Sequence, residues 1–265
     1  MQGRLFLWAD GWMLLAGPIH NRRHRHVAAS LLFGLDQPLA VEAGGKLFSG
    51  RAVLVAPDVV QSLDSGGNTL VVHLDPDSAL WLTLSDAVET GRLLPWAEEE
   101  AECLATLMDC DDASAARTLL ASMPGFANPL AITAAGAWGG GASGQECSPP
   151  TRLDQRAVGL ARRLREDLPE RLDLTGLADQ AGLSAARLSR LFRDTFGVTP
   201  KRFLLHLKMQ RALHHWQPGM TAAELAQAAG FYDQPHLIRT AREMFDALPS
   251  SFLGNPDFRL IRSDG

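Results

Sequence analysis

The N-terminal half of the chain carries four histidines whose imidazole nitrogens are potential metal ligands: His20, His24, His26 and His73. His24 and His26 stand two residues apart, so a β-strand would point both rings to one face. A zinc or iron site of this kind also needs a carboxylate and a third histidine on a later strand. No carboxylate has suitable spacing, and Gln61 stands where the third histidine is expected. We therefore expect no metal and no cofactor, and a structural or surface role for the histidines.

The sequence also lacks the motifs of common enzyme chemistry. It contains no nucleophile elbow, phosphate-binding loop or dinucleotide fingerprint. Cys103 and Cys110 lie seven residues apart on an expected helix, where both are expected to pack rather than react. Three cysteines are too few for a disulfide framework, and no uncharged run reaches the ~20 residues of a membrane span. We expect a cytoplasmic protein that is not an enzyme and does not contact a membrane.

The most informative chemistry lies in a repeat within the C-terminal half. Residues 177–192 and 225–240 both begin with Leu-Ala, followed by a glycine, a polar capping residue, an apolar residue and an arginine. The glycine permits a tight turn between two helices, and the second helix then presents Arg190 or Arg239 on its outer face. A guanidinium there can bind guanine in the major groove of DNA. A single exposed arginine is more often only solvated, so the paired repeat, rather than either arginine, favours DNA binding.

Helices must position these arginines. Apolar periodicity and capping residues predict helices over residues 153–168, 175–182, 184–196, 200–217, 221–229 and 233–246, with a short turn at 249–253 and no strands. The connecting helix 200–217 is about 27 Å long at 1.5 Å per residue. Its ends can therefore hold two recognition helices in major grooves roughly 34 Å apart.

The charge of the chain is divided between its halves. Residues 1–150 carry a net charge of −9 and residues 151–265 carry +4, so only the second half is suited to nucleic acid. Residues 139–150, GGGASGQECSPP, are typical of a flexible linker. We expect an N-terminal domain over residues 1–135, a linker over 136–151 and a DNA-binding domain over 152–265.

Short strands separated by turns predict a barrel or sandwich in the N-terminal half. The strands are expected at residues 5–8, 12–15, 26–35, 52–56, 59–63 and 69–74, with a hairpin turn at Asp10-Gly11. Residues 96–123 then show helical periodicity in two stripes, which predicts an antiparallel helix hairpin. Two roles stay open for this hairpin: a lid on the barrel, or a surface through which two copies form a homodimer.

Residues 184–203, SAARLSRLFRDTFGVTPKRF, resemble the first recognition helix and following loop of the AraC/XylS family of bacterial transcription regulators. Residues 221–253 resemble that family's second unit, and the N-terminal half is loosely similar to its cupin-like sensing domain. The resemblance implies two tandem helix-turn-helix units joined by a long helix. Three positions depart from the pattern: Pro235 lies in the second recognition helix, Ala241 replaces an aromatic residue and Asp246 replaces a glycine. Base reading by the second unit therefore stays open.

The resemblance also implies roles for individual positions. Those that match base-contacting residues are Ala186, Ser189, Arg190, Gln234, His236 and Arg239. Those expected to contact phosphate are Arg187, Arg193, Lys201, Arg202 and Arg242. Phosphate contacts position a protein on DNA without specifying a sequence.

We therefore expect a transcription regulator that reads two adjacent major-groove segments of a DNA operator. The N-terminal half is expected to sense a small-molecule effector, to dimerise, or both. Its aromatic residues are expected to line the barrel interior, as core or as the wall of an effector pocket: Trp8, Trp12, Phe33, Phe48 and Trp81. Two alternatives stay open: a cupin-type metalloenzyme domain fused to a DNA-binding tail, and a constitutive regulator whose N-terminal half only dimerises.

Overall fold

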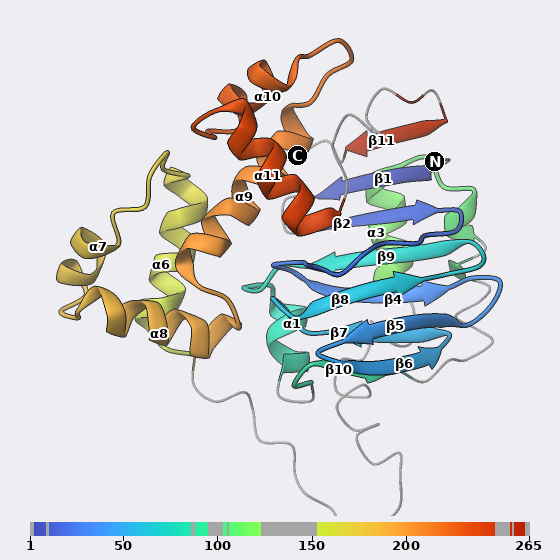
Figure 1. Cartoon of the computed structure of the whole chain (residues 1–265), viewed down its shortest axis with the longest axis horizontal. Helices are drawn as coiled ribbons and strands as arrows, with labels where there is room; N and C mark the ends of the chain where they lie inside the picture. The colour runs from blue at the N-terminus through green and yellow to red at the C-terminus, as the bar shows by residue number, and fades with distance from the viewer. Residues whose placement is uncertain are drawn as a thin grey trace, which may run out of the picture.

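The computed structural model of the chain describes residues 3–8, 11–85, 88–94, 103–104, 106–122, 153–246, 255 and 257–262. Figure 1 shows a sheet-rich N-terminal half lying beside a helical C-terminal half. The expected linker at 136–151 and the expected turn at 249–253 lie outside the described residues. The predicted layout, a mainly β half followed by helices, is confirmed.

The strands form two sheets. The larger sheet has the order β10-β7-β4-β9-β2-β1-β11 and the smaller sheet the order β3-β8-β5-β6. The strands of the larger sheet are β1 (Gly3–Trp8), β2 (Gly11–Ala16), β4 (Ala29–Gly34), β7 (Ala52–Val55), β9 (Thr69–Leu74), β10 (Gly91–Leu93) and β11 (Phe258–Arg262). Those of the smaller sheet are β3 (His24–Arg25), β5 (Leu39–Ala43), β6 (Lys46–Gly50) and β8 (Val60–Asp64). Two apposed sheets agree with the expected barrel or sandwich.

The hydrophobic core of this half lies on both faces of the larger sheet. Between the sheets, Val53 and Val71 meet Val41 and Leu63 of the smaller sheet. The opposite face is covered by α1 (Ala79–Leu84) and α3 (Ala113–Ser122). Strands β4, β7 and β9 are consequently buried at every position, which explains their continuous apolar sequences.

Within the expected helix hairpin, the structure describes α3 and helical residues at 103–104 and 106–108. Their apolar side chains pack on the larger sheet: Leu104, Leu107, Ala113, Ala116 and Leu120 are buried in its core. The Trp8 indole also donates a hydrogen bond to the Ala113 carbonyl at 2.8 Å. Cys103 and Cys110 pack against the same core, as expected. These contacts favour the lid role for this segment.

Five of the described strands have no predicted counterpart, namely β3, β5, β6, β10 and β11, and one predicted strand is too long. The expected strand 26–35 corresponds to β4 alone, whereas β3 precedes it and belongs to the smaller sheet. Strands β5 and β6 form a hairpin around Gly44 and Gly45, whose φ angles are +58° and +79°. A Gly-Gly pair is a known hairpin signal because two successive residues need positive φ. Together with the alternation of Leu39, Val41 and Ala43, that pair could have revealed the hairpin.

The six expected helices of the C-terminal half are present, with ends within two residues of the prediction. They are α6 (Gln155–Asp167), α7 (Leu174–Gln180), α8 (Ala185–Phe196), α9 (Pro200–His215), α10 (Ala222–Ala228) and α11 (Gln234–Phe245). Their capping residues act as expected: Thr199 caps α9 ahead of Pro200, and Thr221 and Glu224 form a capping box.

The expectation that this half contains only helices is wrong at residues 258–262. This segment is β11, which pairs in parallel with β1, with Leu260 opposite Leu5. No local sequence pattern indicates this pairing, because the partner strand is some 250 residues away. The last described strand therefore completes the first sheet of the chain (Figure 1).

Candidate nucleic-acid interface and the cavity beside it

The two repeats fold as two helix-turn-helix units, α7–α8 and α10–α11. Gly182 and Gly230 occupy the turns with φ of +65° and +74°. No atom lies within 4 Å of a Cβ built on Gly182. The turn therefore requires glycine for its left-handed backbone and not for lack of space.

Each recognition helix is capped and anchored as the sequence predicts. The Ser184 hydroxyl accepts a hydrogen bond from the Arg187 amide, and the Asp233 carboxylate accepts one from the His236 amide. Leu188 and Leu237 are buried in one continuous core with α6 and α9. The buried Ala241 belongs to the same core, which packs closely at the position where an aromatic residue was expected.

The residues matched to base-contacting positions lie largely on open surface. Ala186, Arg190, Gln234 and Arg239 are exposed, whereas Ser189 and His236 are half-buried. Arg190 lies 3.7 Å from Asp194 one turn along its helix, with its side chain 85% exposed. This solvated ion pair contributes little to the stability of the fold, and it leaves the Arg190 guanidinium accessible. Pro235 lies in the first turn of α11, where its missing amide proton breaks no helical hydrogen bond.

The residues matched to phosphate contacts divide into two groups. Arg187, Arg193, Lys201 and Arg242 are exposed. Arg202 is different, because its side chain is only 19% exposed and its Nε atom lies 2.7 Å from Asp58 Oδ1 in the N-terminal half. A second ion pair joins Arg202 to Glu243 of α11. In this structure Arg202 therefore links the two halves instead of facing outward.

Helix α9 connects the two units, as expected. Its 16 residues span about 24 Å. Figure 1 shows α8 near the beginning of α9 and the α10–α11 unit beside its later part. The two recognition helices are thus separated along a single helix.

Both recognition helices end against the N-terminal half. At the end of α8, a Cβ on Gly197 would lie 3.6 Å from Pro57, beside the Arg202–Asp58 ion pair. At the end of α11, Asp246 accepts hydrogen bonds from the Arg22 backbone amide and guanidinium, both at 2.8 Å. Asp246 has φ of +50°, a left-handed conformation that glycine adopts more readily. The interdomain bonds of its carboxylate give a physical reason for aspartate at this departure from the family pattern.

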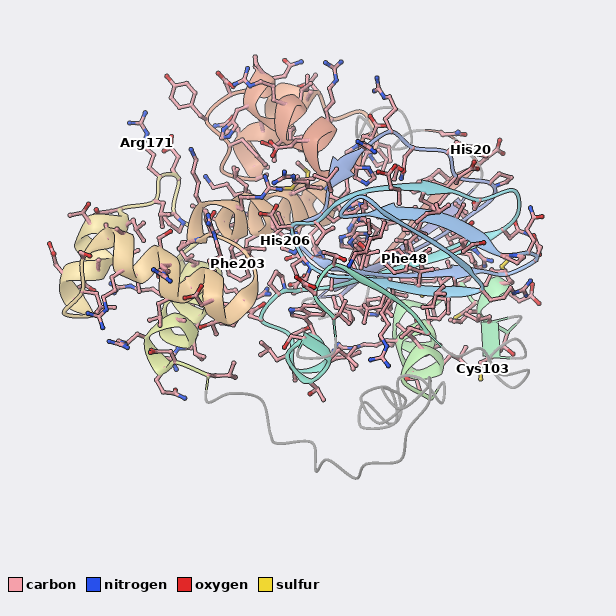
Figure 2. All side chains as sticks on the ribbon, turned by 60° about the horizontal axis from the view of Figure 1, so that its bottom comes forward. His20, Phe48, Cys103, Arg171, Phe203 and His206 are labelled. Carbon is pink, nitrogen blue, oxygen red and sulfur yellow. The ribbon has the colours of Figure 1, made fainter. Side chains whose placement is uncertain are left out.

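A buried polar network joins the halves at a third point. The fully buried Asp75 follows β9, and its carboxylate accepts hydrogen bonds from His206 and Gln210 of α9, each at 2.8 Å. Arg165 of α6 contacts the same carboxylate at 2.5 Å. Burial opposes ionisation of Asp75, but His206 and Arg165 outweigh it and lower its pKa to about 2. Figure 2 shows His206 at the boundary between the helices and the sheets.

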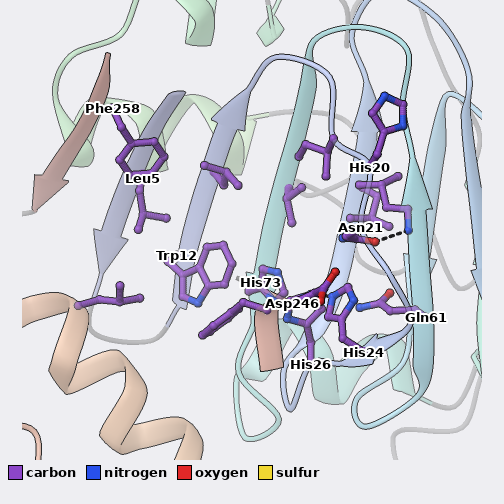
Figure 3. Close-up of a pocket in the computed structure, with 17 residues that line it drawn as sticks. Leu5, Trp12, His20, Asn21, His24, His26, Gln61, His73, Asp246 and Phe258 are labelled. Atoms are coloured by element: carbon purple, nitrogen blue, oxygen red, sulfur yellow. Dashed lines mark hydrogen bonds between the residues drawn. The ribbon is translucent and has the colours of Figure 1, made fainter. Parts of the chain in front are cut away.

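A cavity of about 210 Å³ lies between the two halves, beside the end of α11. Most of its wall comes from the N-terminal half: Leu5, Trp12, Leu14, Ile19, His20, Asn21, His24, His26, Leu32, Gln61, Leu63, Val71 and His73. The C-terminal half contributes Leu213 of α9, Phe245 and Asp246 at the end of α11, and Phe258 of β11. Figure 3 shows Leu5 and Phe258 at one side and the histidines, Gln61 and Asp246 at the other.

Three of the four histidines meet in this cavity. His24 Nε2 and His26 Nε2 are 2.7 Å apart, and the rings of His26 and His73 are 4.2 Å apart. Burial lowers the pKa of His24, and lowers those of His26 and His73 well below the ordinary range. Among the described residues, no group of three histidine, cysteine or acidic side chains is arranged to hold a metal ion. His20 also lines the cavity but is largely exposed, and its Nδ1 lies 2.6 Å from Asp64 Oδ1.

The aromatic residues expected inside the barrel are distributed differently. Trp12 lines the cavity and stacks on His73 with ring centres 3.8 Å apart. Phe48 packs at the edge of the core between the sheets. Trp8, Phe33 and Trp81 lie on the opposite face of the larger sheet, under α1 and α3, so the prediction is wrong for these three. The fold alternates side chains between faces, and the sequence did not show which face is inside.

Comparisons with known proteins agree with the domain structure. A family model described as "Helix-turn-helix domain" matches residues 177–255. The HTH-type transcriptional regulator GbdR of Pseudomonas aeruginosa is 33% identical over 87 residues, which cover 32% of this chain and 24% of GbdR. The HTH-type transcriptional activator RhaS of Pectobacterium atrosepticum is 32% identical over 89 residues, which cover 33% of this chain and 32% of RhaS. The chain thus matches about a quarter to a third of the length of these curated relatives, and the C-terminal half holds a helix-turn-helix domain of the AraC type.

The whole fold is also similar to a solved structure. A variant of apo ToxT from Vibrio cholerae matches with a TM-score of 0.59 over 91% of this chain and 96% of that chain, at 8% identity. This likeness shows a shared two-domain fold. The predicted helix-turn-helix domain of the AraC type and the predicted two-domain architecture are therefore confirmed, and the metalloenzyme alternative is not favoured. Among the described residues, no helix is both long and apolar enough to cross a lipid bilayer.

Proposed function

We propose that this protein is a DNA-binding transcription regulator, and not an enzyme, whose operator binding is controlled by a small molecule in the cavity between its halves. The observation that carries the proposal is the position of the cavity. Its wall includes Phe245 and Asp246, the last residue of the second recognition helix and its cap. An occupant would contact the sensing half and a DNA-reading helix at once.

DNA reading would use the outer faces of α8 and α11. In helix-turn-helix proteins the N-terminal residues of the recognition helix contact base edges. The N-terminal ends of α8 and α11 are exposed here, while their C-terminal ends rest on the N-terminal half. We retain Ala186, Ser189, Arg190, Gln234, His236 and Arg239 as base contacts. We retain Arg187, Arg193, Lys201 and Arg242 as phosphate contacts and omit Arg202, because its guanidinium binds two carboxylates.

Control would operate through the relative placement of the two recognition helices. Each helix ends at a different contact with the N-terminal half, α8 at Pro57–Asp58 and α11 at Arg22. A ligand that binds one arrangement of these contacts more tightly shifts the population toward it. One solved ToxT structure holds an unsaturated fatty acid, so a protein with this fold does take a small molecule.

Self-association through residues 96–123 stays a prediction. The described apolar residues of this segment pack on the larger sheet, which leaves mainly small and polar side chains such as Ser114, Ala115 and Thr118 exposed. Sedimentation of the purified protein across a concentration series would measure its oligomeric state. A monomer at every concentration that binds DNA would contradict the homodimer.

The proposal is tested by selecting bound sequences from random DNA and then measuring affinity for the selected operator. Arg190→Ala should weaken operator binding by about 1–3 kcal/mol and relax base preference at one position. Arg162→Ala is a matched control, because Arg162 is also an exposed helical arginine facing a carboxylate four residues along its helix. DNA reading by α8 would be contradicted if the selection enriched no sequence, or if the two substitutions changed operator affinity equally.

A further inference from the structure

The cavity between the halves has an apolar end and a polar end. Leu5 and Phe258 lie toward one end, and His24, His26 and Gln61 lie at the other, where β3 pairs with β8 (Figure 3). Cavities of about 150 Å³ lined by apolar residues hold benzene, so a volume near 210 Å³ fits one ring with a short substituent. The occupant would therefore be small and amphipathic, and the polar end decides its chemical class.

A chain of hydrogen bonds fixes which histidine nitrogens carry protons. His24 Nδ1 lies 2.8 Å from the Arg22 carbonyl oxygen, which only accepts, so Nδ1 must donate. His24 is neutral at pH 7 because burial lowers its pKa, and its Nε2 therefore has a lone pair. His26 Nε2, 2.7 Å away, must donate to that lone pair. In neutral His26 the remaining nitrogen, Nδ1, is consequently an acceptor.

That acceptor is buried and has no hydrogen-bond partner among the described residues. The Gln61 side chain also has a buried acceptor without a partner among the described residues. It is 5% exposed and donates through Nε2 to the Ser30 hydroxyl, while its Oε1 accepts no hydrogen bond from the described part of the chain. His73 Nε2 is also buried without a hydrogen-bond partner among the described residues. An unpaired buried acceptor costs roughly 1–3 kcal/mol, so an occupant that brings a donor to His26 Nδ1 or Gln61 Oε1 is favoured.

The same end is unfavourable for an anion. Two unpaired acceptors lie at that end, and Asp246 also lines the cavity. The nearby Arg22 guanidinium binds Asp246 and is 87% exposed, so it points to solvent and not to the cavity. Among the residues described as lining the cavity there is no lysine or arginine to neutralise an acid.

We propose that the cavity binds a small uncharged molecule with a hydroxyl donor on an apolar body, such as an alkylphenol, and that the hydroxyl donates to His26 Nδ1 or Gln61 Oε1. This inference rests on the proposed effector role of the cavity. The aromatic ring would lie among Trp12, Phe245 and Phe258, which all line the cavity, with the rings of Trp12 and Phe245 5.7 Å apart. Specificity would come from the donor, since a site with unpaired acceptors rejects an analogue without one.

The test compares three probes of similar size: 4-propylphenol, 4-propylanisole and 4-propylbenzoate. Calorimetric titration of the full chain at pH 7.5 should show the phenol binding at least tenfold more tightly than the ether or the acid. His26→Phe keeps a ring in place, and should lower phenol affinity about fivefold to tenfold while leaving the ether unchanged. Gln61→Met is a second variant with the same expectation. His215→Phe, at an exposed position on α9, is the matched control.

Three outcomes would overturn the inference: equal binding of phenol and ether, preference for the acid, or no binding of any probe by folded protein. Circular dichroism shows whether each variant is folded, and because two different residues are tested, misfolding of one does not end the experiment. Operator affinity is measured on the same samples. Sequence-specific DNA binding without phenol preference would reject only the ligand class, whereas absence of specific DNA binding would reject the proposed function.

Discussion

At the residue scale, arginines of similar sequence context have different roles, because one of them forms an ion pair with a carboxylate of the N-terminal half. Arg193 and Arg202 both belong to the run that resembles a DNA-binding motif. Arg193 is exposed, whereas Arg202 binds Asp58 and Glu243. Sequence position therefore identified a cationic surface but did not identify which of its members face solvent.

This difference predicts the salt dependence of DNA binding. Arg193→Ala should weaken binding to all DNA sequences alike and reduce the slope of log affinity against log salt by about one unit, because one phosphate contact is lost. Arg202→Ala should leave the slope unchanged. Fluorescence anisotropy of labelled duplexes between low and moderate salt measures both slopes. A reduced slope for Arg202→Ala would show that Arg202 contacts phosphate when DNA is bound.

The histidines of the cavity predict how stability depends on pH. Burial lowers the pKa of His24, His26 and His73 in the folded protein, so below about pH 6.5 the unfolded chain takes up protons that the folded chain does not. Stability should therefore be complete above pH 7 and should fall as the pH decreases toward 5. Urea denaturation at pH 7.5, 6 and 5 measures this loss. The loss should be smaller in His26→Phe, and an equal loss would exclude His26 as a contributor.

At the scale of elements, β11 ties the C-terminal half to the sheet of the N-terminal half. The Gly3 amide donates to the Asp257 carbonyl, and Gly3 is opposite Phe258. In a parallel ladder this register directs the amides of Arg259 and Ile261 toward β1, and that of Leu260 away from it. Arg259 also contacts Asp111 at 2.9 Å, and Arg262 donates to the Leu213 carbonyl.

Proline substitutions test this register. Ile261→Pro removes an amide that faces β1, whereas Leu260→Pro removes one that does not, and both side chains are half-buried. Ile261→Pro should destabilise the protein by about 1–3 kcal/mol more than Leu260→Pro, since it also leaves a carbonyl of β1 without its donor. Urea denaturation measures the difference. Equal destabilisation by the two substitutions would mean that backbone pairing of β11 adds little to stability.

At the scale of the whole molecule, Asp75 joins β9 to two helices of the other half. Asp75→Asn should destabilise the protein by about 3 kcal/mol, because Arg165 and His206 would lose the charge that compensates their burial. The pKa of Asp75 is about 2 when folded and close to 4 when unfolded, so this stabilisation should be present above pH 4 and lost as the pH falls toward 2. Urea denaturation at pH 7 compares the variant with Asp77→Asn, which alters only the partly exposed side of the same network. Equal destabilisation by the two substitutions would remove Asp75 from the centre of this interface.

The sequence predicted those features whose signals are local. Helix periodicity, the caps Ser184, Thr199 and Thr221, and the turn glycines each act within a few residues, and the helices agree with the structure. The Asp75–Arg165 and Arg22–Asp246 contacts join residues 90 and 224 positions apart, and the cavity is lined by both Leu5 and Phe258. The periodicity of apolar residues carries no information about such distant pairs. The departure of Asp246 from the family pattern was visible in the sequence, but its cause became apparent only with Arg22 beside it.

The pairing of β11 with β1 also determines the order in which the fold can be completed during synthesis. Residues 3–8 leave the ribosome some 250 residues before the strand that covers their outer edge, which is translated after the described helices α6 to α11. Until then the nascent sheet has an open edge of unpaired backbone groups, which is the kind of surface that recruits another growing chain. We therefore expect this edge to be open to pairing with other copies of the chain until β11 docks on β1.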